Sequence, residues 1–112
     1  MTHYMNLHPG PFEMIKSKIK TVEMRLNDEK RKLIKINDLI IFTNNVTDEE
    51  LVVKVIDIKS YKNFSLLYKE YSKEEIGYKE NEISNPDDML KYYSEEQILK
   101  YGVLAVRIEV IE

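Results

Sequence analysis

Residues 18–25 read Lys-Ile-Lys-Thr-Val-Glu-Met-Arg, and within this stretch the apolar period changes from that of a helix to that of a strand. The preceding segment, residues 9–18, places Phe12 and Ile15 on one face of a helix and has proline in its first turn. From residue 21 to 26, polar and apolar residues alternate, which is typical of a strand with one buried face. The sequence therefore predicts a helix followed directly by a strand.

Three strongly charged side chains, Lys20, Glu23 and Arg25, meet at the start of this strand. Glu23 and Arg25 are two residues apart, so they share a face of the strand at a Cα separation of roughly 7 Å. Such a group combines two cationic donors with a carboxylate that can accept hydrogen bonds or act as a general base. It could hold an anion or the polar edge of a base. The alternative is an exposed ion pair on a solvated sheet face, which contributes little to stability.

The rest of the chain predicts strands and short helices around a segment at 72–84 that is polar and irregular. The spacing Ser94-x-x-Gln97 is a capping-box pattern for the start of a helical turn. The further predicted elements are strands at 39–43 and 51–58, a helix at 63–71, a helix beginning at Pro86, a helical turn at 94–101 and a strand at 103–111. This order predicts an α+β fold with a curved, mostly antiparallel sheet or barrel.

The composition limits the classes of function. The chain has 112 residues, enough for one domain, and its lack of Cys excludes a disulfide framework and a Cys nucleophile. Its net charge of −3 argues against binding of duplex DNA through a broad basic face. No signal peptide is visible and the longest apolar run, 39–42, is far too short to cross a membrane, so a cytoplasmic location is expected. The charge is uneven: residues 16–35 carry +5 and the rest −8, which predicts a basic edge beside the charged trio.

The charged stretch resembles the G-x-K-x-x-E-x-R motif of the ASCH domain (activating signal cointegrator homology), a member of the PUA-like superfamily. Lys20, Glu23 and Arg25 match the K, E and R, and Lys18 stands at the Gly position. The resemblance to small single-domain bacterial ASCH proteins continues at five further segments: 5–12, 25–31, 41–44, 92–96 and 101–103. It implies a single ASCH domain over 1–112 with a curved, mostly antiparallel β-barrel, flanking helices and a cleft lined by the motif.

The superfamily is associated with RNA and modified bases, so the resemblance implies RNA, or a modified nucleoside or nucleotide, as the partner. Lys20 and Arg25 would donate to a phosphate or a base carbonyl, and Glu23 would accept from an exocyclic amine. No cofactor is expected. His3 and His8, five residues apart, lack the converging ligands of a metal site, so they are interpreted as surface or packing residues.

The resemblance also implies a second hypothesis, because some small ASCH proteins resemble amidohydrolases that deacetylate N4-acetylcytidine with a Lys, a Thr and a Glu. Lys20 aligns with their Lys, but Glu23 stands where they have Thr, and Thr21 is two residues away. In that case Lys20 would assist proton transfer, and the base would be Glu23 itself or one of the glutamates near the predicted helix at 63–71. The candidates among these are Glu70, Glu74 and Glu75.

Two further residues are candidates for the cleft. Asn44 follows a predicted buried strand and either reaches the cleft or serves as a turn residue. Tyr93, or its neighbour Tyr92, is the candidate for stacking on a base, although most tyrosines here are expected in the core or at its rim. A third hypothesis, a partner-binding domain without a small ligand, requires an exposed apolar patch in place of a charged cleft.

Overall fold

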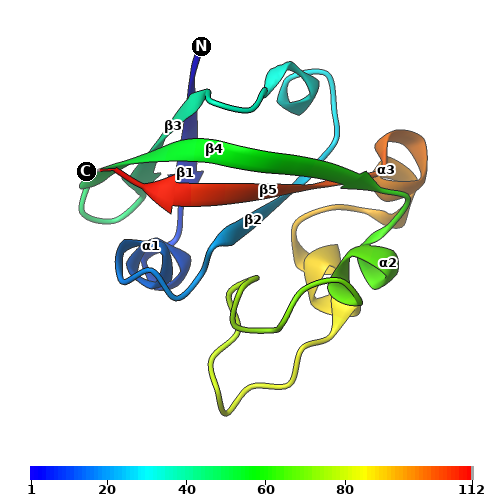
Figure 1. The fold of residues 1–112 in the computed structure, drawn as a ribbon. Helices are drawn as coiled ribbons and strands as arrows, with labels where there is room; N and C mark the ends of the chain where they lie inside the picture. The colour runs from blue at the N-terminus through cyan, green and yellow to red at the C-terminus, as the bar shows by residue number, and fades with distance from the viewer. Residues whose placement is uncertain (112) are drawn as a thin grey trace.

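Five strands form one sheet that is curled into a half-barrel (Figure 1). The computed structural model describes residues 1–111, and the strand order across the sheet is β1-β3-β4-β5-β2. β1 runs parallel to β3, and every other neighbouring pair is antiparallel. The strands are β1 (Thr2–Leu7), β2 (Val22–Leu26), β3 (Leu39–Asn44), β4 (Glu50–Tyr61) and β5 (Val103–Val110).

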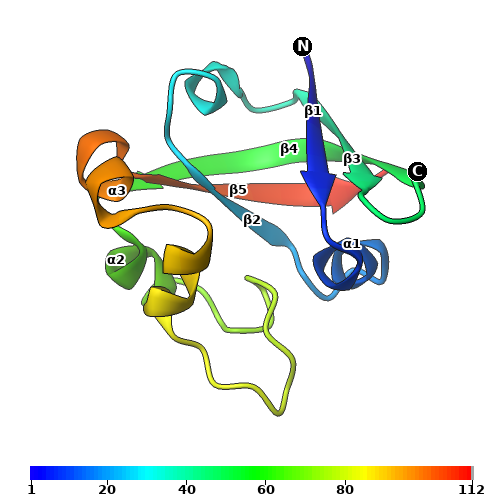
Figure 2. The same cartoon turned by 180° about the vertical axis from the view of Figure 1, so that it is seen from behind.

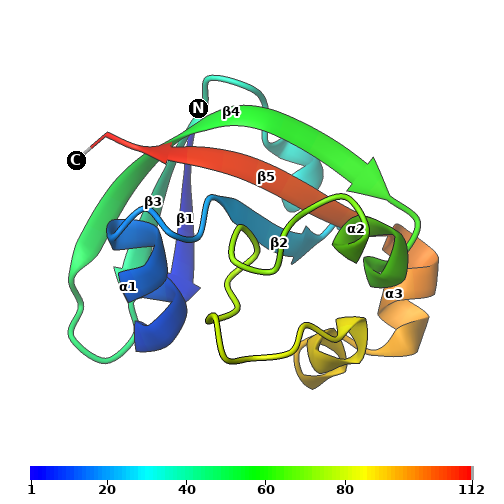
Figure 3. The same ribbon diagram turned by 60° about the horizontal axis from the view of Figure 1, so that its bottom comes forward.

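The sheet curls because β4 is long and bent. Its pairing with β5 shifts register between Val55 and Asp57, and such a bulge increases the local twist of a strand. β4 and β5 therefore arch over the other elements (Figure 3). The half-barrel stays open between its two edge strands, β1 and β2, which Figure 2 shows from behind.

Two apolar clusters pack against the sheet, and they lie on opposite faces of β5, where Leu104 and Val106 belong to the first cluster and Val103 and Ala105 to the second. The first lies under β1, β3 and β4 and includes Phe12 and Ile15 of α1 (Pro9–Lys16), both with no exposed surface. The second lies under β2 and β5 and includes Phe64 and Leu67 of α2 (Phe64–Tyr68). The site described below is lined by members of both clusters, Leu7 of the first and Met24 and Met89 of the second.

The remaining elements are short and are fixed by local caps. In α3 (Glu95–Tyr101), Ser94 and Gln97 make the expected capping box in both directions. The 3₁₀ helix η2 (Pro86–Lys91) is capped by Asn85, whose side chain accepts a hydrogen bond from the amide of Asp87. A second 3₁₀ helix, η1, spans Arg31–Leu33. Within residues 1–111, no helix is both long and apolar enough to cross a membrane.

Most of the predicted elements are confirmed, and three need correction. The chain begins with a strand, β1, and not with the helix that the sequence predicts as its first element. The helix predicted at 63–71 ends at Tyr68, and the one beginning at Pro86 is 3₁₀. The predicted fold class, α+β with a curved, mostly antiparallel sheet and flanking helices, is confirmed, and the sheet is a five-stranded half-barrel in which β1 is parallel to β3.

Candidate functional site

Lys20, Glu23 and Arg25 form one buried ionic group at the start of β2. The Lys20 Nζ lies 2.7 Å from Glu23 Oε1, and the Arg25 Nη2 lies 2.7 Å from Glu23 Oε2. The side chains of Lys20 and Glu23 are only 9% and 4% exposed. The trio is therefore not the solvated surface pair that its spacing alone also allows, and breaking one partner would leave a buried charge uncompensated.

The three side chains of the trio stabilise one another's charged forms. Burial by itself would raise the pKa of Glu23, but Lys20 and Arg25 outweigh it and lower that pKa to about 2. Burial would likewise lower the pKa of Arg25, whereas Glu23 and the neighbouring Tyr93 hydroxyl raise it. Glu23 is thus ionised at neutral pH with both carboxylate oxygens engaged, which makes it a fixed anchor and a poor general base.

Arg25 also connects the two free edges of the half-barrel. Its Nη2 donates to the main-chain carbonyl of Asn6 on β1, 3.3 Å away, while its Nε donates to Glu23 at 2.8 Å. The guanidinium therefore bridges β2 to β1 across the opening of the sheet. This link fixes the width of the opening at the level of the trio.

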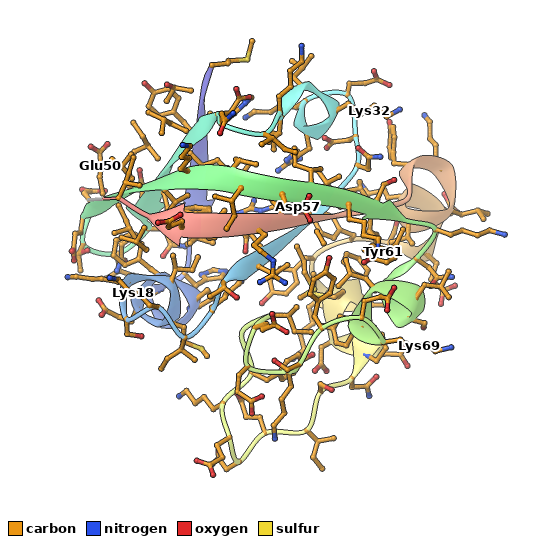
Figure 4. The ribbon with its side chains drawn as sticks, viewed as in Figure 1. Lys18, Lys32, Glu50, Asp57, Tyr61 and Lys69 are labelled. Carbon is orange, nitrogen blue, oxygen red and sulfur yellow. The ribbon has the colours of Figure 1, made fainter. Side chains whose placement is uncertain are left out.

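The turn before β2 explains the glycine position of the motif. Lys18 has a φ of +69°, and the amides of Lys18 and Ile19 donate to the carbonyls of Ile15 and Met14. This is a Schellman ending of α1, whose left-handed residue is most often glycine. Figure 4 shows Lys18 beside the end of α1. A lysine occupies the position here at a cost in backbone strain, and the turn keeps its geometry.

The segment after α2 covers Lys20. The main-chain carbonyl of Glu75 accepts from the amides of Thr21 and Val22, which fastens this segment to the start of β2. Gly77 has a φ of +108°, and a Cβ there would lie 3.0 Å from the Cδ of Lys20. Only glycine satisfies both the conformation and the close approach.

A cleft of about 690 Å³ opens above the trio, a size typical of small-molecule sites. The trio lines it from β2, and further residues come from the end of β1, the loop after β3, the 72–85 segment and η2. Figure 2 shows these elements on both sides of β2. Besides the trio, the polar and aromatic lining residues are Asn6, His8, Asn45, Tyr68, Tyr78, Glu82, Asp88, Lys91, Tyr92 and Tyr93.

One wall of the cleft is formed by two tyrosines and an aspartate that are joined by hydrogen bonds. The Tyr78 hydroxyl donates to Asp88 Oδ2 at 2.7 Å, so Tyr68, whose hydroxyl lies 2.9 Å from that of Tyr78, donates to Tyr78. Burial is the main reason why the pKa values of Tyr68 and Tyr78 are raised, and both stay protonated. This wall therefore presents phenol rings and one carboxylate to the cleft.

The candidates for stacking lie beside this wall. The ring of Tyr93 packs on Phe64 at a centroid distance of 6.2 Å with 12° between the planes, and it lines the cleft as well. Tyr92 also lines the cleft and is 59% exposed. Tyr92 is thus the ring that a ligand can reach without displacing core side chains.

The other predicted site residues lie elsewhere. Asn44 is 3% exposed, and its side chain accepts hydrogen bonds from the amides of Val46 and Thr47. It therefore serves as a turn residue, and its neighbour Asn45 lines the cleft. Of the three glutamates, Glu75 pairs with Arg107 at 3.1 Å, Glu70 faces Lys59 at 3.7 Å, and Glu74 is not among the lining residues.

Sequence reasoning did not find Tyr78, Glu82, Asp88 and Asn45, which all lie in loops or a 3₁₀ helix. Their approach to β2 depends on contacts between distant segments of the chain. The one local signal was Gly77, a glycine within a polar segment of a chain that has only three glycines. For His8 the sequence predicts a surface or packing role, and the structure places it in the lining of the cleft.

The basic residues of 16–35 do not form one continuous surface. Lys16 pairs with Glu49 and Arg31 with Asp28, while Lys20 and Arg25 are both neutralised in part by Glu23. Figure 4 shows Lys18 and Lys32 on opposite sides of the sheet. Four of the eight basic residues of this segment are thus paired with carboxylates, which weakens the basic edge predicted from the count of charges.

Comparisons with solved structures agree with this fold. Hypothetical protein PH0355 is 34% identical, with a TM-score of 0.84 over 99% of this chain and 100% of its own. Protein PF0455 from Pyrococcus furiosus is 32% identical, with a TM-score of 0.76 over 100% of this chain and 99% of its own. A mutant ZmASCH protein from Zymomonas mobilis is 17% identical, with a TM-score of 0.63 over 96% of this chain and 67% of its own, and shows the fold alone.

Among curated proteins, none matches the chain significantly. Because Pyrococcus furiosus is an archaeon, the expectation of a specifically bacterial type is not supported. The family model of the ASCH domain matches residues 5–112, nearly the whole chain. The protein belongs to the ASCH domain family.

Proposed function

We propose that the cleft binds one nucleoside or nucleotide, free or as an unpaired unit of single-stranded RNA. The observation that carries this is the buried Lys20–Glu23–Arg25 group at the floor of a cleft with tyrosines on its walls. Polar donors below and aromatic rings beside a cavity are what a base requires for hydrogen bonding and stacking.

The trio retains donors for a ligand. An ammonium has three N–H donors and a guanidinium five. Within residues 1–111, the Lys20 Nζ contacts Glu23, and Arg25 donates through Nε and Nη2 to Glu23 and Asn6. The further protons of the Lys20 Nζ are thus the proposed donors to a carbonyl or ring nitrogen, together with the guanidinium face of Arg25 that a ligand would share with the Tyr93 hydroxyl.

The charges of the cleft favour a single unit over a long strand. The lining contains three cations, Lys20, Arg25 and Lys91, and three carboxylates, Glu23, Glu82 and Asp88. A balanced lining gives little attraction to several phosphates, in contrast to the basic tracks of strand-binding proteins. The base and sugar would occupy the cleft, with any phosphate at its rim.

The alternative function, hydrolysis of an acylated nucleoside such as N4-acetylcytidine, has less support. Among the residues that the structure describes, no Ser or Thr lines the cleft, and Glu23 is ion-paired on both oxygens with a lowered pKa. Hydrolysis would therefore need a water activated by Glu82 or Asp88. Turnover of N4-acetylcytidine by the protein, abolished in Asp88→Asn or Glu82→Gln, would establish this activity in place of simple binding.

Binding can be tested with the four ribonucleosides and their 5′-monophosphates by calorimetry. Tyr92→Ala should weaken the best ligand by roughly five- to a hundredfold, because stacking of a base contributes about 1–3 kcal/mol. Tyr4→Ala is the matched control, since Tyr4 is 64% exposed on β1 and does not line the cleft. Equal affinities in both variants, or no binding of any ligand to the wild type, would refute the proposal.

A further inference from the structure

His8 lies in the cleft and is not part of the charged trio. It follows β1 directly, is exposed, and lines the cavity together with Asn6 and Asn45. The sequence predicts a surface or packing role for it. The structure places an imidazole, which can donate and accept at once, at the wall of the proposed binding site.

Asn45 orients this imidazole. The Asn45 Nδ2 lies 3.0 Å from the His8 Nδ1. An amide nitrogen is only a donor, so in this arrangement Nδ1 is the acceptor and the proton of the neutral ring is on Nε2. The Nε2–H is thereby left to donate to another group.

Asn45 itself is held in place by the main chain. Its amide donates to the Leu7 carbonyl at 2.9 Å, which fastens the loop after β3 to the end of β1. The side chain of Asn44 accepts from two amides of the same loop, at Val46 and Thr47. The loop is therefore pre-organised on the segment that carries His8.

Helix stability does not explain a histidine at this position. His8 is the N-cap residue of α1, where Ser, Thr, Asp or Asn is preferred, and its side chain makes no capping hydrogen bond. Its main-chain carbonyl accepts from Phe12, which any residue could do. The side chain is directed to Asn45 at the cleft instead.

His8 also lies at the Arg25 end of the cleft. Arg25 donates to the carbonyl of Asn6, and His8 follows two residues later in extended backbone, roughly 7 Å further along. Arg25 and His8 line the same cleft, so one bound ligand can contact both.

We propose that His8 donates its Nε2–H to an oxygen or ring nitrogen of the bound nucleoside or nucleotide, with Asn45 as the positioning residue that fixes the tautomer. This inference rests on the proposed function of the cleft. It adds a ligand-binding residue outside the motif and a second residue that acts through it.

The tautomer can be measured without a ligand. Long-range ¹H–¹⁵N spectra at pH 8 should show His8 predominantly with the proton on Nε2, and Asn45→Ala should move it toward a mixture of the two tautomers. A predominant Nδ1–H form in the wild type, or an unchanged spectrum in Asn45→Ala, would overturn the positioning role.

The donor role is tested with the best of the eight nucleosides and monophosphates. His8→Ala should lower affinity roughly three- to tenfold, the effect of one neutral hydrogen bond, and His8→Gln, which retains an N–H donor, should restore most of it. Glu13→Ala, an exposed change on α1 away from the cleft, is the control.

The outcomes separate the two proposals. If Tyr92→Ala weakens binding but His8→Ala does not, the donor role of His8 is refuted and the proposed function stands. If no ligand binds the wild type, both the proposed function and the donor role fail, while the ligand-free spectra still decide whether Asn45 fixes the tautomer.

Discussion

At the scale of single residues, the free energy of unfolding should depend on pH through Glu23. Its pKa is lowered from about 4.5 to about 2 in the folded protein, so its contribution is complete above pH 4.5 and is lost as the pH falls toward 2. A shift of this size corresponds to roughly 3 kcal/mol. Urea unfolding from pH 6 to pH 2.5 measures this loss.

A substitution separates Glu23 from the other carboxyl with a similar shift, Asp38, whose pKa is lowered to about 2 chiefly by its hydrogen bond to His3. Glu23→Gln should destabilise the protein by about 3 kcal/mol at neutral pH, because two buried cations lose their partner. Its acid dependence should be shallower than that of the wild type. Glu49→Gln, which removes the exposed partner of Lys16, should cost less than about 1 kcal/mol. Equal costs of the two changes would contradict the buried ionic group.

Lys18 offers a second prediction at this scale. Because its φ is +69°, Lys18→Gly should remove strain and raise the free energy of unfolding by about 0.5–1 kcal/mol. Lys18→Ala is the control, since alanine keeps the Cβ and therefore the strain. If the glycine variant is no more stable than the alanine variant, the left-handed turn is not as described.

At the scale of elements, the segment 72–85 must lie close against Lys20 for the cleft to exist. Gly77→Ala introduces a Cβ 3.0 Å from the Lys20 side chain at a φ of +108°. It should destabilise the protein by about 2 kcal/mol and weaken ligand binding, because alanine is strained at this φ and its Cβ must displace the buried Lys20 side chain. Gly10→Ala, with open space around its Cβ, should be neutral or slightly stabilising. The prediction is checked by measuring the free energy of unfolding and the ligand affinity of both variants.

The elements that the sequence predicts correctly have local signals. α1 begins at two prolines and α3 at a capping box, while β2 and β5 show their alternation within a few residues. β1 has no such signal, because its short segment pairs in parallel with β3, far along the chain. The charged trio was predictable because its three members lie within six residues. Tyr78, Asp88 and His8 required the folding of distant loops against β2.

At the scale of the whole molecule, the dispersed basic residues predict how binding should depend on RNA length. An unpaired oligonucleotide should bind no more than about threefold tighter than the best single nucleotide. The slope of log affinity against log salt should be no steeper than about −1, the value for one or two phosphate contacts. Fluorescence anisotropy with RNAs of one to ten nucleotides tests this. A slope of about −3 would indicate a basic track that the distribution of ion pairs does not provide.

The central claim is that the cleft above Lys20, Glu23 and Arg25 is the ligand-binding site. The most direct measurement is an NMR titration of ¹⁵N-labelled protein with the four ribonucleosides and their 5′-monophosphates. The account predicts saturable shifts confined to the lining of the cleft, at the end of β1, β2, the 72–85 segment and η2. Shifts centred on any other surface, or none with all eight compounds, would contradict it.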